Sequence, residues 1–230
     1  MKERQILMKA GPVNAILAGR QTQDRRPIRP QPIPSSGQWS DLWIVKTDGK
    51  RKGMSCINAT EWDVQYWCKQ WCPYGQVGDR LWVRETFVLE SNFNLDTYPP
   101  PFDDGRPVRW VEDEEFGRYW QQPHYRATDP PPELYYSDRE DGTVKWTPSI
   151  HMPRWACRIV LELTDVRVER VQDITEEDAQ AEGVEWLPVH PGNSTNYIRS
   201  FADLWDSIYA KQGRSFNLNP WVWVLDFKVV

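Results

Sequence analysis

Cysteine and histidine are scarce in this chain, with four cysteines and three histidines among 230 residues. Cys68 and Cys72 form a C-x3-C pair, but no second pair of cysteines or histidines lies at the spacing of a zinc site. The histidines are scattered, as His124, His151 and His190. We therefore expect no metal ion and no cofactor.

Long apolar runs are also missing. No segment approaches the ~20 apolar residues that a membrane-spanning helix requires, and Gly11 and Pro12 interrupt the N-terminal region. These absences predict a cytoplasmic protein without membrane contact, whose cysteines stay reduced.

Positive charge is in deficit, because the formal net charge is −5. A protein that holds nucleic acid by neutralising many phosphates is usually basic, so any nucleic-acid contact here is expected to be local. Two short basic clusters, Arg25–Arg26–Arg29 and Lys50–Arg51–Lys52, are candidates for that contact or simply solvated surface.

Aromatic residues, in contrast, are abundant, with 14 Trp, 9 Tyr and 7 Phe. Most are expected to fill the core, because tryptophan buries a large area. A few are expected to line a site as platforms on which bases stack.

Residue patterns predict an α+β fold. Strands are expected at 4–9, 41–50, 78–89, 124–128, 158–171 and 219–230, and helices at 12–18, 60–71, 175–182 and 197–212. Thr175 with Asp178 forms a capping box, and Gly19, Gly183 and Gly213 are expected to end helices. Strands and helices do not alternate regularly, so a partly open β-barrel of mostly antiparallel strands with three or four short helices is favoured over a doubly wound sheet.

Residues 90–142 differ from the rest, because they are acidic and rich in proline. This composition predicts an insertion that contributes little to the core, with one strand at 124–128. Its acidity makes it a candidate surface for binding a host protein.

The N-terminal stretch "ILAGRQTQDRR", Ile16 to Arg26, resembles the signature of the ASCH domain family. Further segments resemble a longer phage and prophage branch of that family: "CPYGQVGDRLWVRETF", "YRA", "WTPSIHMPRWACRI", "ITEEDAQAEGV", "FADLWDSI" and "NPWVWVLDF". The resemblance implies a single PUA-like domain over residues 1–230, with the insertion at about 90–142.

Some ASCH proteins are amidohydrolases that remove the acetyl group from N(4)-acetylcytidine. The resemblance implies that such enzymes rely on a Lys and a second Thr of the N-terminal motif and a Glu of the later helix, positions occupied here by Gln21, Asp24 and Glu182. Gln21 cannot transfer a proton at neutral pH, and Arg20 is a poor base. Asp24 and Glu182 remain candidate catalytic residues as a general-base pair for water.

Other candidate residues are expected to bind the ligand by hydrogen bonds, ion pairs or stacking. They are Arg20, Gln21, Thr22, Arg26, Arg84, Glu85, Tyr125, Arg126, Ser149, His151 and Arg154. Structural roles compete with these: Glu182 as a helix-terminal carboxylate, Arg84 and Glu85 as members of cross-strand ion pairs, and His151 as a core residue in a turn.

We expect the chain to recognise a nucleobase or nucleic acid, RNA or a modified base, in a pocket between the N-terminal motif and the strand at 158–171. One alternative is an enzyme, an amidohydrolase or ribonuclease acting on modified cytidine or RNA. The other is a phage or prophage accessory protein that binds a host protein.

Overall fold

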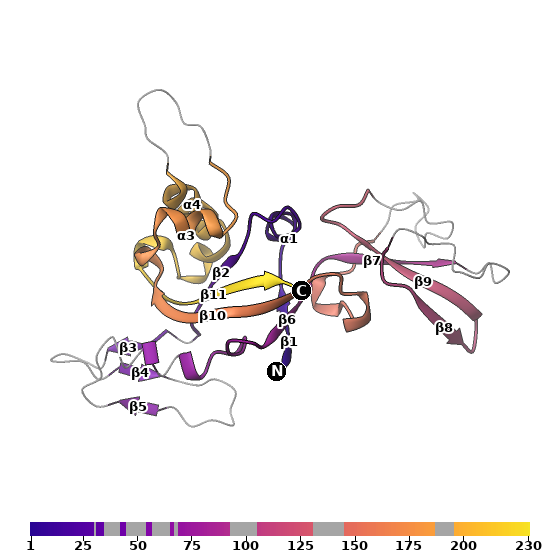
Figure 1. Ribbon diagram of the computed structural model, residues 1–230, viewed down its shortest axis with the longest axis horizontal. Helices are drawn as coiled ribbons and strands as arrows, with labels where there is room; N and C mark the ends of the chain where they lie inside the picture. The colour runs from indigo at the N-terminus through magenta and orange to yellow at the C-terminus, as the bar shows by residue number, and fades with distance from the viewer. Residues whose placement is uncertain are drawn as a thin grey trace. The chain divides into compact units, whose positions relative to one another are not determined.

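The computed structural model describes residues 1–29, 31–34, 42–44, 54–56, 65–66, 69–92, 105–130, 145–186 and 196–230 (Figure 1). Within them the chain is a mixed α+β protein whose strand pairs are mostly antiparallel, with three α-helices. The described strands do not close into a barrel. The chain forms two compact units. Unit 1 comprises Met1–Lys2, Ala18–Asp79 and Glu162–Lys228, and unit 2 comprises Glu3–Leu17, Arg80–Leu161 and Val229–Val230.

The main sheet of unit 1 contains three strands in the order β10 (Val160–Arg170), β11 (Trp221–Val229) and β2 (Gln23–Pro27). β11 and β2 pair antiparallel, with Val224 opposite Arg25. A second, antiparallel sheet is formed by β3 (Ile33–Pro34), β4 (Leu42–Ile44) and β5 (Met54–Cys56). Because β2 is an edge strand, one of its sides is open to other parts of unit 1.

Helices α3 (Glu176–Ala181) and α4 (Tyr197–Tyr209) pack over β11. Phe201 and Trp205 of α4 are buried against Val222 and Val224. The side chain of Thr175 accepts a hydrogen bond from the backbone N–H of Asp178 at 3.1 Å, so the N-cap half of the predicted capping box is present. The helix predicted at 197–212 is confirmed, since α4 is followed directly by a 3-10 turn at Ala210–Gln212.

Unit 2 contains a parallel pair, β1 (Glu3–Leu7) with β6 (Arg80–Arg84), and the helix α1 (Ala10–Leu17). It also contains an antiparallel sheet in the order β7 (Phe87–Asn92), β9 (Gly117–Tyr125) and β8 (Arg109–Asp113). Two short 3-10 turns follow, η1 (Ser149–His151) and η2 (Arg154–Ala156). The core comprises Phe87, Tyr125, Met152, Ala156 and Cys157.

Several predicted elements need correction. The single strand expected at 78–89 is two strands in different sheets, β6 and β7, separated at Glu85 and Thr86. Glu85 is buried there and accepts a hydrogen bond from Arg158. The strand expected at 124–128 is instead the end of β9, which pairs with both β7 and β8. The described part of the 90–142 segment therefore contributes to the core, since Tyr125 is fully buried.

The predicted helix at 12–18 is confirmed but starts earlier, at Ala10, and Gly19 follows it with a left-handed φ of +69°. Strand β2 was not predicted, because its sequence QDRRP contains only polar residues and proline. Most of the predicted helix at 60–71 lies outside the described residues, although 65–66 and 69–70 are helical. Among the described helices, none has the length and apolar character required to cross a membrane.

Candidate functional site

The predicted site residues divide between the two units. Unit 1 contains Arg20, Gln21, Thr22, Asp24, Arg26 and Glu182, and unit 2 contains Arg84, Glu85, Tyr125, Arg126, Ser149, His151 and Arg154. Each group is a separate candidate with its own geometry.

In unit 1, the end of α3 lies along the outer side of β2. The backbone N–H of Thr22 donates to the carbonyl oxygen of Ala181 at 2.9 Å, and Gln21 forms an isolated antiparallel bridge with Glu182. The backbone N–H of Arg25 donates to Oε2 of Glu182 at 3.3 Å. These bonds bring Glu182 to the N-terminal motif.

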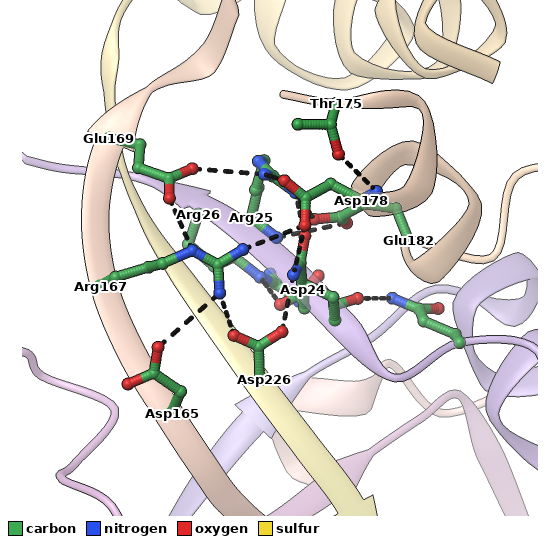
Figure 2. Close-up of polar contacts among 12 residues, drawn as sticks. Asp24, Arg25, Arg26, Asp165, Arg167, Glu169, Thr175, Asp178, Glu182 and Asp226 are labelled. Carbon is green, nitrogen blue, oxygen red and sulfur yellow. Dashed lines mark hydrogen bonds and ion pairs between the residues drawn. The ribbon is translucent and has the colours of Figure 1, made fainter. Parts of the chain in front are cut away.

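Arg25 is the centre of this site, and the sequence did not predict it. Its side chain is fully buried, and its guanidinium contacts Glu182 at 3.1 Å, Asp178 at 3.0 Å and Glu169 at 3.4 Å (Figure 2). It also donates to the side-chain oxygen of Gln23. The interpretation of Arg25 as solvated surface is therefore wrong, because tertiary contacts surround it with carboxylates.

A second guanidinium extends the network towards solvent. Arg167 contacts Glu169 at 2.6 Å, Asp178 at 3.1 Å and Asp226, with Asp165 at 3.8 Å (Figure 2). The Gln23 amide joins the two halves, because it donates to Asp178 at 3.1 Å and to Asp226 at 2.6 Å. The sequence offered one signal for this network. Asp226 is the single charged residue in the otherwise apolar stretch "WVWVLDF", a pattern that indicates a carboxylate with a polar partner in the fold.

Asp24 and Arg26 form the third part of the site. Arg26 Nε donates to Asp24 Oδ2 at 2.6 Å, and both side chains are largely buried. Side chains alternate along a strand, so these two residues and the pair Gln23 and Arg25 belong to opposite faces of β2. Asp24 is therefore engaged by a neighbouring cation rather than free as a base.

We call these groups the polar cluster. It comprises Gln21 and Gln23, three guanidiniums and six carboxylates: Arg25, Arg26, Arg167, Asp24, Asp165, Glu169, Asp178, Glu182 and Asp226. Carboxylates outnumber guanidiniums by three. Glu182 is buried close to both Arg25 and a second carboxylate, Asp24. Burial and, after it, the charge of Asp24 raise the pKa of Glu182, while Arg25 opposes both effects, and the resulting pKa is about 8.

Gln21 is the one predicted ligand-binding residue whose side chain retains an unused group inside the cluster. It is 3% exposed, and its amide nitrogen donates to the backbone oxygen of Gln23 at 2.9 Å. Its side-chain oxygen is buried and has no hydrogen-bond partner. Arg20 and Thr22 are exposed, and Arg20 pairs with Glu185 at 3.4 Å.

In unit 2, Glu85 and Tyr125 belong to a buried ion-pair site. Arg158 donates to both carboxylate oxygens of Glu85 at 2.8 Å, and its guanidinium lies 3.9 Å from the Tyr125 ring centroid. The Tyr125 hydroxyl donates to the Ala156 carbonyl oxygen at 2.8 Å. The ion-pair role proposed for Glu85 is thus present, with Arg158 as its partner.

The other predicted residues of unit 2 are more exposed. Arg84 donates to Gln5 and to the backbone oxygen of Ile150, and Arg154 pairs with Glu3 at 2.7 Å. His151 is exposed on η1, so its alternative role as a core histidine is wrong. The remaining two residues are Arg126, which is exposed, and Ser149, which is half-buried on η1.

Among the described residues, no group of three or more His, Cys, Asp or Glu side chains is arranged to hold a metal ion. Comparison with known proteins finds no matching family model, curated protein or solved structure. The resemblance to the ASCH family therefore stays a prediction.

Proposed function

We propose that the polar cluster of unit 1 recognises a nucleobase, free or within a nucleic acid. The observation that carries this proposal is the side-chain oxygen of Gln21, which is buried and unpaired. Leaving a buried polar atom unpaired costs about 1–3 kcal/mol, so such atoms are rare in folded proteins and require an explanation. A ligand that donates a hydrogen bond to this oxygen would supply the missing partner.

The chemistry around Gln21 suits a base edge. Bases are read by a few directional hydrogen bonds, and an amide oxygen accepts from a ring N–H or an exocyclic amino group. Glu182 lies beside it across the Gln21–Glu182 bridge, with a pKa of about 8. A carboxyl group with that pKa exists largely in its protonated form at neutral pH, and can then donate a hydrogen bond as well as accept one.

Binding of the four ribonucleosides and N(4)-acetylcytidine, measured by titration calorimetry, tests the proposal. Gln21→Met should weaken binding on the order of tenfold or more, because it removes the acceptor and keeps the side-chain length. Gln180→Met, on the exposed side of α3, is the matched control and should leave affinity unchanged. Equal affinities of all three proteins would contradict the proposal.

Salt dependence gives a second check for oligonucleotides. Because the net charge is −5, few counterions should be released, so the log–log slope should correspond to about 2–3 phosphate contacts. A steep slope would indicate an extended basic groove instead.

A second candidate function is hydrolysis, as the resemblance to ASCH amidohydrolases implies. The same resemblance implies that the chain has the partly open PUA-like barrel of that family. The raised pKa of Glu182 next to Asp24 favours it, since an acid that titrates near the working pH is suited to proton transfer. Purified protein would then deacetylate N(4)-acetylcytidine. If only Gln21→Lys, alone or with Asp24→Thr, deacetylates, the unmodified chain is a binding protein that lacks the required cation.

A further inference from the structure

The polar cluster contains more ionised carboxylates than cations, although it lies within a folded unit. Arg25 and Arg167 each contact three or more carboxylates, and Arg26 pairs only with Asp24 among the cluster's acids. Each guanidinium carries one charge, and Lys69 contacts Asp165 at 3.6 Å. With Glu182 protonated, the five other carboxylates exceed these four cations by one, so the site is net negative. The side chains of Glu169, Asp178 and Asp226 are 22–25% exposed, so the field of these carboxylates reaches solvent.

The unpaired side-chain oxygen in the cluster is an acceptor. Gln21 is 97% buried, its amide nitrogen is directed along β2 to Gln23, and its oxygen is without a partner. The Nε of Arg25 also lacks a partner, but that guanidinium lies over the Phe201 ring, 6.0 Å from its centroid, on the side covered by α4. The unpaired Gln21 oxygen is an acceptor and therefore calls for a donor, and the surrounding charge calls for a cation.

We infer that the polar cluster selects a cationic nucleoside, such as one methylated on a ring nitrogen, over its neutral parent and over a nucleotide that carries a phosphate. The inference rests on the proposed function, which is recognition of a nucleobase. What it adds is a preference for a base that carries a positive charge. A charge in a partly buried site interacts several times more strongly than in water, so one positive charge on the base is expected to improve affinity on the order of tenfold. A phosphate placed near the same carboxylates is expected to weaken binding.

Calorimetry with matched ligands measures this selectivity. At pH 7 we expect 3-methylcytidine, which is cationic, to bind about tenfold more tightly than cytidine, and cytidine to bind more tightly than cytidine monophosphate. The pair 1-methyladenosine and adenosine repeats the comparison on a purine. Raising the salt concentration should reduce the preference for the cation, because salt screens the partly exposed carboxylates.

Asp165 allows the charge to be changed without disturbing the buried contacts. Its side chain is 46% exposed and lies 3.8 Å from Arg167. Asp165→Lys should reduce the preference for 3-methylcytidine over cytidine several-fold, because it replaces one of the carboxylates that favour a cation with a positive charge. Asp203→Lys, an exposed position on α4 outside the cluster, makes the same change in net charge and should leave the preference intact.

The outcomes distinguish nucleobase recognition from the preference for a cationic ligand. If cytidine binds as tightly as 3-methylcytidine, or if the monophosphate binds best, the charge preference is wrong while nucleobase recognition survives. If no nucleoside binds but agmatine, an organic dication, binds and Asp165→Lys weakens it, the nucleobase proposal is wrong while the cation site survives. If none of these compounds binds, both are wrong.

Discussion

The guanidinium of Arg25 contacts Oε1 of Glu182 at 3.1 Å, and the backbone N–H of the same arginine donates to Oε2 at 3.3 Å. One residue thus engages both oxygens of one buried carboxylate, although the two residues are 157 positions apart. Strand β2 and the end of α3 are joined through this double contact. The pair therefore links the N-terminal motif to the rest of unit 1.

Replacing Arg25 should be strongly destabilising. Arg25→Met leaves the buried Glu182 without its cation and removes one of the two guanidiniums that contact Asp178 and Glu169. Removing one partner of a buried ion pair costs about 3–5 kcal/mol. Urea denaturation measures the loss. Arg118→Met is the control, because Arg118 and its partner Glu112 are both 65% exposed, and it should change stability by less than about 0.5 kcal/mol. Similar losses in the two variants would show that the Arg25 network contributes no more than a surface pair.

Stability should decrease with pH because of Glu182. Its pKa in the folded protein is about 8, above its ordinary value of 4.5, so the folded state binds a proton that the unfolded state has released. The stabilising contribution is complete below pH 4.5 and is lost as the pH rises to about 8. Each unit of pKa difference corresponds to about 1.4 kcal/mol, so the decrease should amount to several kcal/mol, measured by urea denaturation between pH 5 and 9.

Glu182→Gln isolates that contribution, because glutamine resembles the protonated carboxyl and does not titrate. The profile of the variant should be flatter than that of the parent over the same range. Burial also raises the pKa of Glu85, but that contribution is common to both proteins and cancels in the difference. Parallel profiles would mean that Glu182 titrates normally.

The cap of α3 should contribute measurably to stability. Thr175→Ala removes the side-chain acceptor of the Asp178 N–H and should cost about 1 kcal/mol, whereas Thr175→Ser retains the hydroxyl and should cost little. Thermal or urea denaturation distinguishes the two. If serine is as disruptive as alanine, the threonine methyl group and not the cap is responsible.

Arg158 and Glu85 should behave as a coupled pair. Arg158 donates to both oxygens of a carboxylate that is 2% exposed, and its guanidinium also covers the Tyr125 ring. A double-mutant cycle with Arg158→Met and Glu85→Gln should give a coupling free energy above about 1 kcal/mol. Additive losses would indicate that the two side chains contribute independently.

The sequence predicted elements whose signal is local. Strands β1, β10 and β11, helix α4 and the Thr175 cap are marked by alternation, helical spacing or a side chain that bonds three residues ahead. Strand β2 has no such signal, because its pairing with β11 joins Gln23 to Asp226, 203 residues away. Likewise, Glu85, between β6 and β7, is paired with the distant Arg158, a contact that has no local sequence signal.

For the site, the sequence by itself determined that polar residues follow Gly19, and the resemblance predicts that Gln21 stands where the ASCH family has lysine. Only the tertiary structure decided that Arg25 is the buried centre, that Asp24 is engaged by Arg26, and that Tyr125 is a core residue. The physical reason is that burial and ion pairing are properties of the folded surroundings. An arginine in a polar stretch has the same sequence signature whether it faces water or three carboxylates, and long-range packing alone distinguishes the two.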